Sequence, residues 1–319
     1  MPSNGSLLRS VVITGASSGI GHALARRLDA EGWRVFAGVR NATDAERLRS
    51  ELSARSEPVL LDVTDAAHIA AAKTLVETRT GGRVNAVVNN AGIVFHAPVE
   101  SLTVEGVREQ FEVNVVGVFA VTQAFLPLLR ATHGRVVIVG SISGRVAWPF
   151  NGVYAASKHA VRAMVESLRL EQRSFGVRVS LVEPGAFATS IWQKKTPARF
   201  LANANLEAPV RKRYEAAQRI VERAMDVIGA RAPQPDRCVA AIRHALTARS
   251  PRACYTVGND IWLQLVFASL PASFKDPLIS FGMNRVLKRP DGASRPAIAG
   301  TGARPDVAAR AAGSDPRAH

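Results

Sequence analysis

The sequence is poor in cysteine and in aromatic residues: it has 319 residues, of which 2 are cysteines and 6% are aromatic. Cys238 and Cys254 form neither a CxxC pair nor a spacing typical of metal ligands. A disulfide framework is therefore excluded, and no metal site is expected. Free thiols are typical of proteins in a reducing compartment, so we expect a cytoplasmic protein.

Long hydrophobic runs are lacking as well. The longest apolar-rich stretch, Ile261 to Leu270, falls short of the ~20 residues that a membrane-spanning helix needs. The first expected strand begins near Val11, which leaves no room for a signal peptide. The stretch from Ile261 could still form an interfacial helix in peripheral contact with a membrane. We favour a helix that covers a substrate pocket or a subunit contact, because a row of Lys and Arg on its polar face is missing.

Acidic residues are outnumbered by basic ones. The sequence has 41 Lys and Arg against 26 Asp and Glu, which gives a formal net charge of +15. A charge of this size can indicate a nucleic acid, an anionic membrane surface or an anionic cofactor as partner. The arginines are scattered singly and do not form basic runs interleaved with aromatic residues. We therefore expect no nucleic-acid partner.

Short β-branched runs alternate with helical stretches through most of the chain. Strands separated by helices pair in parallel, with both sheet faces covered. The predicted fold class is α/β, a Rossmann-type doubly wound parallel sheet of about seven strands that binds its ligand at the carboxyl ends of the strands. The expected strands are 11–14, 35–39, 58–61, 84–88, 136–139, 177–182 and 253–257. The expected helices are 19–31, 43–54, 65–78, 104–129, 152–175 and 236–248.

One domain is expected over residues 1–288. The alternation stops at about residues 186–232, where a basic helical stretch predicts a small helical substrate lobe beside the strand ends. Residues 289–319 consist mainly of Gly, Pro, Ala, Arg and Asp. Such a composition cannot bury enough apolar surface to become ordered, so a disordered tail is expected there.

A glycine-rich turn, Thr14-Gly15-Ala16-Ser17-Ser18-Gly19-Ile20-Gly21, joins the first expected strand to the first helix. Glycines permit a tight turn and close approach of a pyrophosphate, and the helix N-terminus offers free N–H groups. Ser17 and Ser18 can cap the helix or donate to phosphate. Because the turn opens a strand–helix series, it favours a dinucleotide site over a plain connection. The predicted contacts here are Gly15, Ser17, Ser18, Gly19, Ile20 and Gly21.

Arg40 follows the second expected strand, where NAD-binding folds carry an acid for the ribose hydroxyls. An arginine can instead pair with a 2′-phosphate and stack on adenine, so NADP(H) is favoured and NAD(H) is the alternative. Arg40 could also form only a surface pair with Asp44 or Glu46. A test of its role is the loss of NADP(H) preference in Arg40→Asp.

Polar and small residues follow the next two expected strands. Asp62, next to Val63, can accept from the adenine amino group or cap the next helix, although Asp65 is the stronger cap candidate. In Asn89-Asn90-Ala91-Gly92, the small residues let a flat ring come close and the asparagines can tie neighbouring strand ends together. The predicted cofactor contacts in these segments are Asp62, Val63, Asn89, Ala91 and Gly92.

Tyr154 and Lys158 are four residues apart and share one helix face. A nearby ammonium and a cationic nicotinamide would both favour tyrosinate, so the pKa of Tyr154 is expected to fall toward working pH. Ser141 lies thirteen positions before Tyr154 at the end of the fifth expected strand. Its hydroxyl could hold a substrate oxygen while Tyr154 exchanges the proton. Ser143 is a competing candidate.

These residues together resemble the short-chain dehydrogenase/reductase family, over residues 10 to about 260. The phosphate loop, Asn89–Gly92, Asn114, Ser141, Tyr154 with Lys158, and Pro184-Gly185 with Thr189 fall in the family's order and spacing. The resemblance implies an NAD(P)(H)-dependent alcohol–carbonyl oxidoreductase with a tetrad of Asn114, Ser141, Tyr154 and Lys158. It also implies a homodimer or homotetramer formed through the two long helices.

The resemblance assigns a role to each tetrad residue. Tyr154 would be the acid/base, and Ser141 would polarise the substrate oxygen. Lys158 would hold the nicotinamide ribose and lower the tyrosine pKa. Asn114 would anchor a water that relays protons. In addition, Pro184, Gly185, Thr189 and the Phe187 backbone would hold the nicotinamide end, with Tyr154 and Lys158 also touching the cofactor.

Several segments are similar to the 17β-hydroxysteroid and retinol dehydrogenase branch, namely residues 140–144, 148–154, 181–185 and 251–255. That branch handles apolar alcohols and ketones, so a steroid-, retinoid- or lipid-like substrate is expected. Trp148, Phe150, Ile191 and Trp192 would line the pocket, or alternatively pack the lobe against the sheet. The alternative function is a non-catalytic NAD(P)-binding regulatory protein on the same fold. Such a sensor would need neither Ser141 nor Tyr154.

Overall fold

The computed structural model describes residues 8–185, 187, 196, 199, 201, 206–215, 217, 219, 234–258 and 261–287, the side chains of 263 and 282–287 excepted. A single sheet of seven parallel strands has the order β3-β2-β1-β4-β5-β6-β7. The strands are β1 Ser10–Ile13, β2 Arg34–Val39, β3 Glu57–Leu60, β4 Ala86–Asn89, β5 Arg135–Val139, β6 Arg178–Pro184 and β7 Cys254–Val257. The predicted doubly wound sheet is confirmed. Its order reverses between β1 and β4, the point where such sheets bind ligands.

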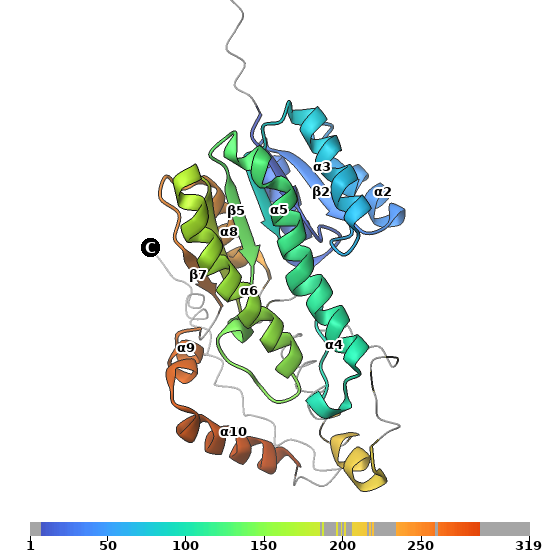
Figure 1. Ribbon diagram of the computed structural model, residues 1–319, viewed down its shortest axis with the longest axis vertical. Coiled ribbons are helices and arrows are strands. Elements are labelled where there is room, and N and C mark those ends of the chain that lie inside the picture. Colours follow the sequence, from blue (N-terminus) through green and yellow to red (C-terminus); the bar gives the residue numbers. More distant parts are fainter. Residues whose placement is uncertain are drawn as a thin grey trace, which may run out of the picture.

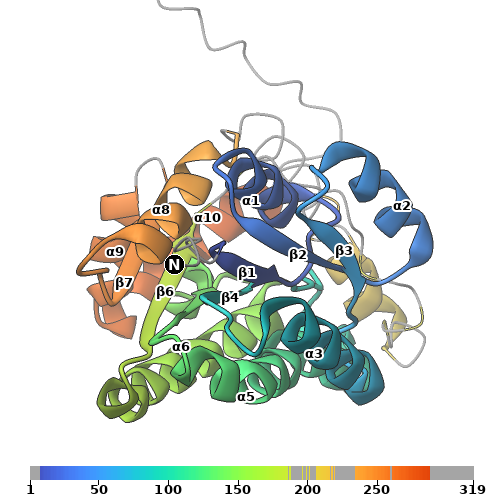
Figure 2. The same ribbon diagram turned by 90° about the horizontal axis from the view of Figure 1, so that it is seen from above.

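Helices cover both faces of the sheet (Figure 2). One face is covered by α1 Gly19–Ala30, α2 Ala42–Glu51 and α8 Asp236–Thr247. The other is covered by α3 Ala66–Thr80, α5 Gly117–Arg130 and α6 Gly152–Glu171. Each face has its own core, because side chains alternate across a strand: Val11 and Ile13 face α1 and α8, whereas Val12 faces α3 and α5.

The longest predicted helix, 104–129, contains a π-helical turn. It consists of α4 Val104–Phe111, η2 Glu112–Val116 and α5. Asn114 lies in the π turn and has no exposed surface. π turns are rare and occur frequently at functional sites. The hydrophobic period of the sequence cannot show such a turn, because one extra residue hardly alters the pattern.

By length and composition, the helix Val104–Arg130 could also cross a membrane. It is a longer apolar helix than the stretch 261–270 that the sequence singles out. Many of its apolar side chains belong to the core under the sheet, where Val121, Phe125 and Leu129 have no exposed surface, while Val104, Val116 and Phe119 are exposed. We therefore interpret it as a core helix.

Two further helices, α9 Ile261–Ser269 and α10 Ala272–Leu287, follow the last strand and lie away from the sheet (Figure 1). The predicted helix near 261–270 is confirmed as α9. Large apolar side chains on both helices are exposed: Trp262, Val266, Phe274, Leu278 and Phe281. Phe267 instead stacks on Trp148, with ring centroids 5.2 Å apart. The predicted disordered tail lies outside the described residues.

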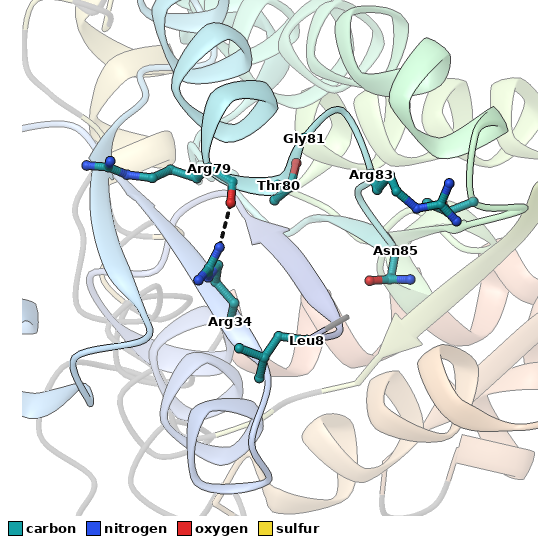
Figure 3. Close-up of a pocket in the computed structure, with 8 residues that line it drawn as sticks. Leu8, Arg34, Arg79, Thr80, Gly81, Arg83 and Asn85 are labelled. Atoms are coloured by element: carbon teal, nitrogen blue, oxygen red, sulfur yellow. Dashed lines mark hydrogen bonds between the residues drawn. The ribbon is translucent and has the colours of Figure 1, made fainter. Parts of the chain in front are cut away.

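A concavity at the amino ends of the strands is lined by residues at the ends of strands and helices (Figure 3). Arg34 points toward the end of α3, where its Nη1 donates to the carbonyl oxygen of Arg79 at 2.5 Å. Asn85 Oδ1 accepts from the Ser10 N–H at 2.8 Å, and Thr132 donates to the Val84 carbonyl. These polar side chains form hydrogen bonds with backbone groups at the ends of strands and helices. The predicted ligand side is the opposite, carboxyl edge.

Candidate active site at the carboxyl edge of the sheet

The backbone of the turn between β1 and α1 is closely packed against itself and against the segment after β4. Gly15 and Gly19 have φ of +65° and +59°, a region that favours glycine. A Cβ on Gly21 would lie 2.4 Å from the Gly15 carbonyl oxygen, and one on Gly15 would lie 2.9 Å from Ala91 Cα. The Ser18 side chain does not cap α1, although Ser18 stands at the N-cap position. Ile20 packs against the core. The geometry fits a loop that brings its backbone close to a phosphate.

Hydrogen bonds join this turn to the end of β4. Thr14 Oγ1 accepts from the backbone N–H groups of Asn90 and Ala91, each at 3.0 Å. Asn90 Nδ2 donates to the carbonyl oxygens of Thr14 and Gly15, also at 3.0 Å. The predicted tie between neighbouring strand ends is therefore present, and it fixes the edge at which the sheet order reverses.

Asn89 differs from its neighbour Asn90. Its side chain is buried and donates to Thr122 Oγ1 of α5 at 2.9 Å. The Asn89 amide thus ties β4 to the helix beneath it. The side-chain oxygen of Asn89 is buried and has no hydrogen-bond partner among the residues that the structure describes, and the cofactor contact of Asn89 stays a prediction.

Asp62 and Asp65 follow β3, and the sequence leaves open which of them caps the next helix. Asp65 caps α3, since its Oδ1 accepts from the N–H groups of Ala67 and His68. Asp62 Oδ1 accepts from the Thr64 N–H at 3.0 Å and from the Thr64 hydroxyl at 2.8 Å. Val63 is buried against Gly117 of α5. Because Asp65 is the cap, Asp62 need not be one, and its adenine role stays a prediction.

Arg40 is exposed and forms no ion pair with any described residue. The alternative pair with Asp44 is not formed, because Asp44 Oδ1 accepts from Arg47 Nη2 at 2.9 Å. Arg47 Nη2 also donates to the carbonyl oxygen of Ser17 at 2.6 Å. The sequence pattern misses Arg47, which places a second guanidinium beside the phosphate loop.

Ser141 stands at the end of β5, and the short helix η3 Ile142–Gly144 follows it. Its hydroxyl oxygen accepts from the Ser143 N–H at 3.1 Å. The Ser143 hydroxyl is buried and accepts from Asn151 Nδ2 at 3.3 Å. The Ser143 side chain is therefore bonded within the fold, whereas the Ser141 side chain acts on Tyr154 and lowers its pKa. The geometry favours Ser141 over its competitor.

Asn114 forms three hydrogen bonds, two to the segment after β4 and one to α6. Its Oδ1 accepts from the Ile93 N–H at 2.9 Å, and its Nδ2 donates to the Ile93 carbonyl at 2.9 Å. Nδ2 also donates to Ser157 Oγ on α6 at 3.1 Å. A Cβ on Gly92 would lie 3.3 Å from Asn114 Oδ1 and 3.7 Å from Lys158 Nζ. The predicted buried asparagine thus has its partners and lies on the same side as Lys158.

Lys158 and Tyr154 lie on one face of α6 as predicted, with Lys158 Nζ 5.7 Å from the centre of the Tyr154 ring. Lys158 Nζ donates to the Val139 carbonyl at 3.1 Å, at the end of β5. Burial lowers the pKa of Lys158 to about 8. Burial also raises the pKa of Tyr154, and the hydrogen bond to Ser141 only partly opposes this. The expected fall in the tyrosine pKa is thus not produced by the protein's own side chains.

The remaining predicted residues lie farther along the edge. Gly185 donates its N–H to the Val257 carbonyl at 2.8 Å, directly after Pro184 at the end of β6. The Phe187 side chain is buried in the core on the α1 and α8 face, so its predicted role rests on its backbone. Thr189, Ile191 and Trp192 lie outside the described residues.

The two described aromatic residues of the predicted pocket stand before α6. Trp148 is 40% exposed and stacks on Phe267 of α9. Phe150 has φ of +64°, which is unusual for a bulky residue. Such backbone outliers cluster at active sites and ligand clamps. The turn is therefore a candidate pocket wall.

The described residues fit a nicotinamide dinucleotide laid across the β1–β4 switch point. Backbone approaches closely at Gly15 and Gly21, and a glycine at position 92 leaves space between Asn114 and Lys158. The strand-end turn offers N–H groups for the phosphates. A tyrosine, a serine and a lysine stand at the other end. The arrangement can hold an oxygen atom, orient it and exchange a proton with it.

Comparisons with known proteins agree with this geometry. The model of the short chain dehydrogenase family matches residues 9–199. The chain is 39% identical to 17-beta-hydroxysteroid dehydrogenase type 6 of Bos taurus over 285 residues, 85% of this chain and 87% of that protein. It is 35% identical to retinol dehydrogenase 5 of Mus musculus over 292 residues, 88% of this chain and 89% of that protein. A short chain dehydrogenase of Burkholderia cenocepacia, solved in complex with NADP, has a TM-score of 0.66 and 25% identity; the match covers 85% of this chain and 97% of the other.

Proposed function

The chain belongs to the short-chain dehydrogenase family, and we propose that Tyr154 and Ser141 carry out its reaction, the NAD(P)(H)-dependent interconversion of an alcohol and a carbonyl. The observation that carries this assignment is the placement of Ser141 and Tyr154 beside the buried Lys158: Ser141 acts on Tyr154 to lower its pKa, and Lys158 Nζ lies 5.7 Å from the centre of the Tyr154 ring. A regulatory protein on the same fold would need neither side chain. The relatives are also named dehydrogenases.

In the proposed mechanism, the Ser141 hydroxyl donates to the substrate oxygen and orients it. The bound nicotinamide supplies or accepts the hydride at its C4 atom. In reduction, Tyr154 Oη gives its proton to the carbonyl oxygen, which becomes the hydroxyl; in oxidation, the proton moves the other way. The raised pKa of Tyr154 suits a proton donor in the protein alone. The positive charge of an oxidised nicotinamide would favour the tyrosinate that oxidation requires.

Lys158 and Asn114 support this proton transfer. With a pKa lowered to about 8, Lys158 gives up and regains a proton near neutral pH more readily than an ordinary lysine. Asn114 bonds Ile93 and Ser157, and Ser157 Oγ donates to the Tyr154 carbonyl at 2.7 Å. This chain of bonds fixes the tyrosine end of α6 against the segment after β4. We propose that Lys158 contacts the nicotinamide ribose and returns the Tyr154 proton toward a water held at Asn114.

We also propose that NADP(H) is the preferred cofactor. The support is Arg40, exposed after β2 and without an acidic partner among the described residues, together with Arg47, which donates to the Ser17 carbonyl of the phosphate loop. A guanidinium at the ribose position would suit a 2′-phosphate better than two free hydroxyls. The relative from Burkholderia cenocepacia was solved with NADP.

The proposed substrate is an apolar alcohol or ketone of the steroid or retinoid type. Two relatives carry the names of a hydroxysteroid and a retinol dehydrogenase. In this chain, Trp148 and Phe150 supply aromatic surface in the turn before α6, and Phe267 of α9 stacks on Trp148. An apolar wall with a few polar groups is the usual form of such pockets. Ile191 and Trp192 remain predicted members of the wall.

Purified protein tests the proposal when it is titrated with NADP(H) and NAD(H) and then assayed with steroids, retinoids and long-chain aldehydes. Short polar alcohols serve as the control substrates. We expect turnover of at least one apolar compound, and a decrease of about 10²-fold or more in kcat for Ser141→Ala but not for Ser50→Ala, an exposed serine of α2. Turnover restricted to short polar alcohols would contradict the substrate class. Full activity of Ser141→Ala would contradict the site.

We propose that the protein is a homodimer or homotetramer in the cytoplasm. The two long helices α5 and α6 lie side by side (Figure 1), and exposed apolar residues on or near them include Val116, Phe119, Leu170 and Phe175. Both cysteines are free thiols, which suits a reducing compartment. Light scattering of the wild type and of Phe119→Glu tests the assembly; a monomeric wild type would contradict it. We assign α9 to a pocket wall or subunit contact, and sedimentation with vesicles tests the membrane alternative.

A further inference from the structure

A buried carboxylate at the end of β6 joins the two segments that carry the reacting groups. Glu183 has no exposed surface. Its Oε2 accepts from Arg145 Nε at 2.7 Å, and its Oε1 accepts from Arg162 Nη1 at 2.6 Å. The Cys254 thiol of β7 also donates to Oε2 at 3.1 Å. We call these four residues the Glu183 cluster.

The two arginines of the cluster come from different parts of the active site. Arg145 directly follows η3 and lies four residues after Ser141. Arg162 lies on α6, four residues after Lys158 and eight after Tyr154. In the sheet, β6 lies between β5 and β7, and α6 covers this part of the sheet (Figure 1). One carboxylate therefore binds both the serine segment and the helix with the tyrosine and lysine.

The packing between these segments leaves little freedom. A Cβ on Gly144 would lie 2.9 Å from the Lys158 carbonyl oxygen, so η3 rests directly on the backbone of α6. Arg145 Nη2 additionally contacts Cys254 Sγ at 3.6 Å. Burial by itself lowers the pKa of Arg145, but the bond to Glu183 outweighs it and raises that pKa, so the guanidinium stays charged. A charged pair held on both oxygens fixes direction as well as distance.

Stability does not account for this arrangement. Burying charges costs desolvation energy, and replacement of a buried ion pair or triad by apolar residues of similar volume is often neutral or stabilising; here Glu183 is buried, whereas Arg145 and Arg162 are partly exposed. What the cluster adds is a fixed geometry between Ser141 and Tyr154. We propose that Glu183 is a positioning residue for the reaction, acting through Arg145 and Arg162 to hold Ser141 at the correct place relative to Tyr154 and Lys158. This inference rests on the proposed function of those residues.

The first test is kinetic. Glu183→Gln removes the charge at nearly constant shape, and we expect kcat to fall about 10–100-fold while the KM for the cofactor changes less than about threefold. Glu183→Asp, which keeps the charge, should recover part of the lost kcat. Glu77→Gln is the matched control, because Glu77 pairs only with Lys73 on the distant helix α3, and it should leave kcat unchanged. A loss confined to KM, or an unaltered kcat in Glu183→Gln, would overturn the inference.

A second variant keeps the test valid if Glu183→Gln does not fold. The triple variant Glu183→Met, Arg145→Met and Arg162→Met replaces the buried charges by apolar side chains, so it should unfold at a temperature equal to or above that of the wild type. We expect its kcat to remain at least tenfold below wild type. A folded triple variant with wild-type kcat overturns the inference alone. A wild-type protein without turnover on any substrate overturns the proposed function, and the inference with it.

Discussion

The two ends of the candidate site are built differently. At the reaction end, Asn114 and Lys158 are buried and bonded to backbone groups of Ile93 and Val139. At the adenosine end, Arg40 and Arg47 are exposed. The difference teaches that the core fixes the residues proposed to react, whereas the proposed choice between NADP(H) and NAD(H) would depend on surface side chains. Changes at the reaction end should therefore affect rate and stability together, and changes at the adenosine end should affect cofactor preference alone.

The largest change in rate is expected when Lys158 is replaced. Lys158→Met should lower kcat by about 10³-fold, because a buried ammonium next to Tyr154 is lost. It should also stabilise the fold. The pKa of Lys158 is lowered from 10.5 to about 8, so burial of the charge costs up to ~3 kcal/mol at neutral pH. Calorimetry should show a higher unfolding temperature for the variant.

The pH dependence of this effect has a definite sign. Because the folded pKa of Lys158 lies below the unfolded value, the unfolded state binds more protons between pH ~8 and ~10.5. The stability of the wild type should therefore rise over that range relative to Lys158→Met. The difference in the free energy of unfolding between Lys158→Met and the wild type should be largest below pH ~8 and should disappear toward pH ~10.5. A constant difference across this range would contradict the buried-charge account.

An intermediate effect is expected at Asn114. Asn114→Ala leaves the N–H and carbonyl of Ile93 without their side-chain partner. Unfolding in denaturant should show a loss of about 1–3 kcal/mol. We expect kcat to fall about 10–100-fold, because the segment after β4 is no longer fixed. A loss of stability with an unchanged kcat would show that the residue serves only the fold.

The smallest effect on rate is expected at Arg40. A substitution there should change cofactor preference without changing rate or stability. Arg40→Asp should lower the ratio of kcat/KM for NADP(H) over NAD(H) by about 10–100-fold, through loss of a charge-assisted bond to the 2′-phosphate. The kcat with the better cofactor and the unfolding temperature should hardly change. Arg49→Asp, at an exposed position of α2, is the control. An unaltered ratio in Arg40→Asp would remove the proposed phosphate contact.

Much of the fold could be predicted because its signals are local. Each strand is a short β-branched run, and the glycine-rich turn precedes the first helix directly, so both the sheet and the phosphate loop can be read from neighbouring residues. The tetrad of Asn114, Ser141, Tyr154 and Lys158 is implied by the resemblance to the family, in whose order and spacing these residues fall. Asp62 and Ser143 show the limit of this approach, because only their hydrogen-bond partners distinguish the alternatives for them.

Features that depend on residues far apart could not be predicted. Residues 145, 162, 183 and 254 come from the end of η3, from α6, from β6 and from β7, and they meet only in the folded chain. The direction of the Tyr154 pKa shift depends on burial, which a helical spacing does not contain. The π turn at Glu112–Val116 contains Asn114, whose bonds to Ile93 join residues that are 21 positions apart.

The most direct test of the central claim compares two tyrosine variants. Tyr154→Phe removes the proposed proton donor, whereas Tyr214→Phe removes only an exposed hydrogen bond to Glu100. With NADPH and a carbonyl substrate of the wild type, single-turnover hydride transfer should slow by about 10²–10⁴-fold in Tyr154→Phe and remain unchanged in Tyr214→Phe. Equal rates in wild type and Tyr154→Phe would contradict the assignment of this residue as the acid/base of the reaction.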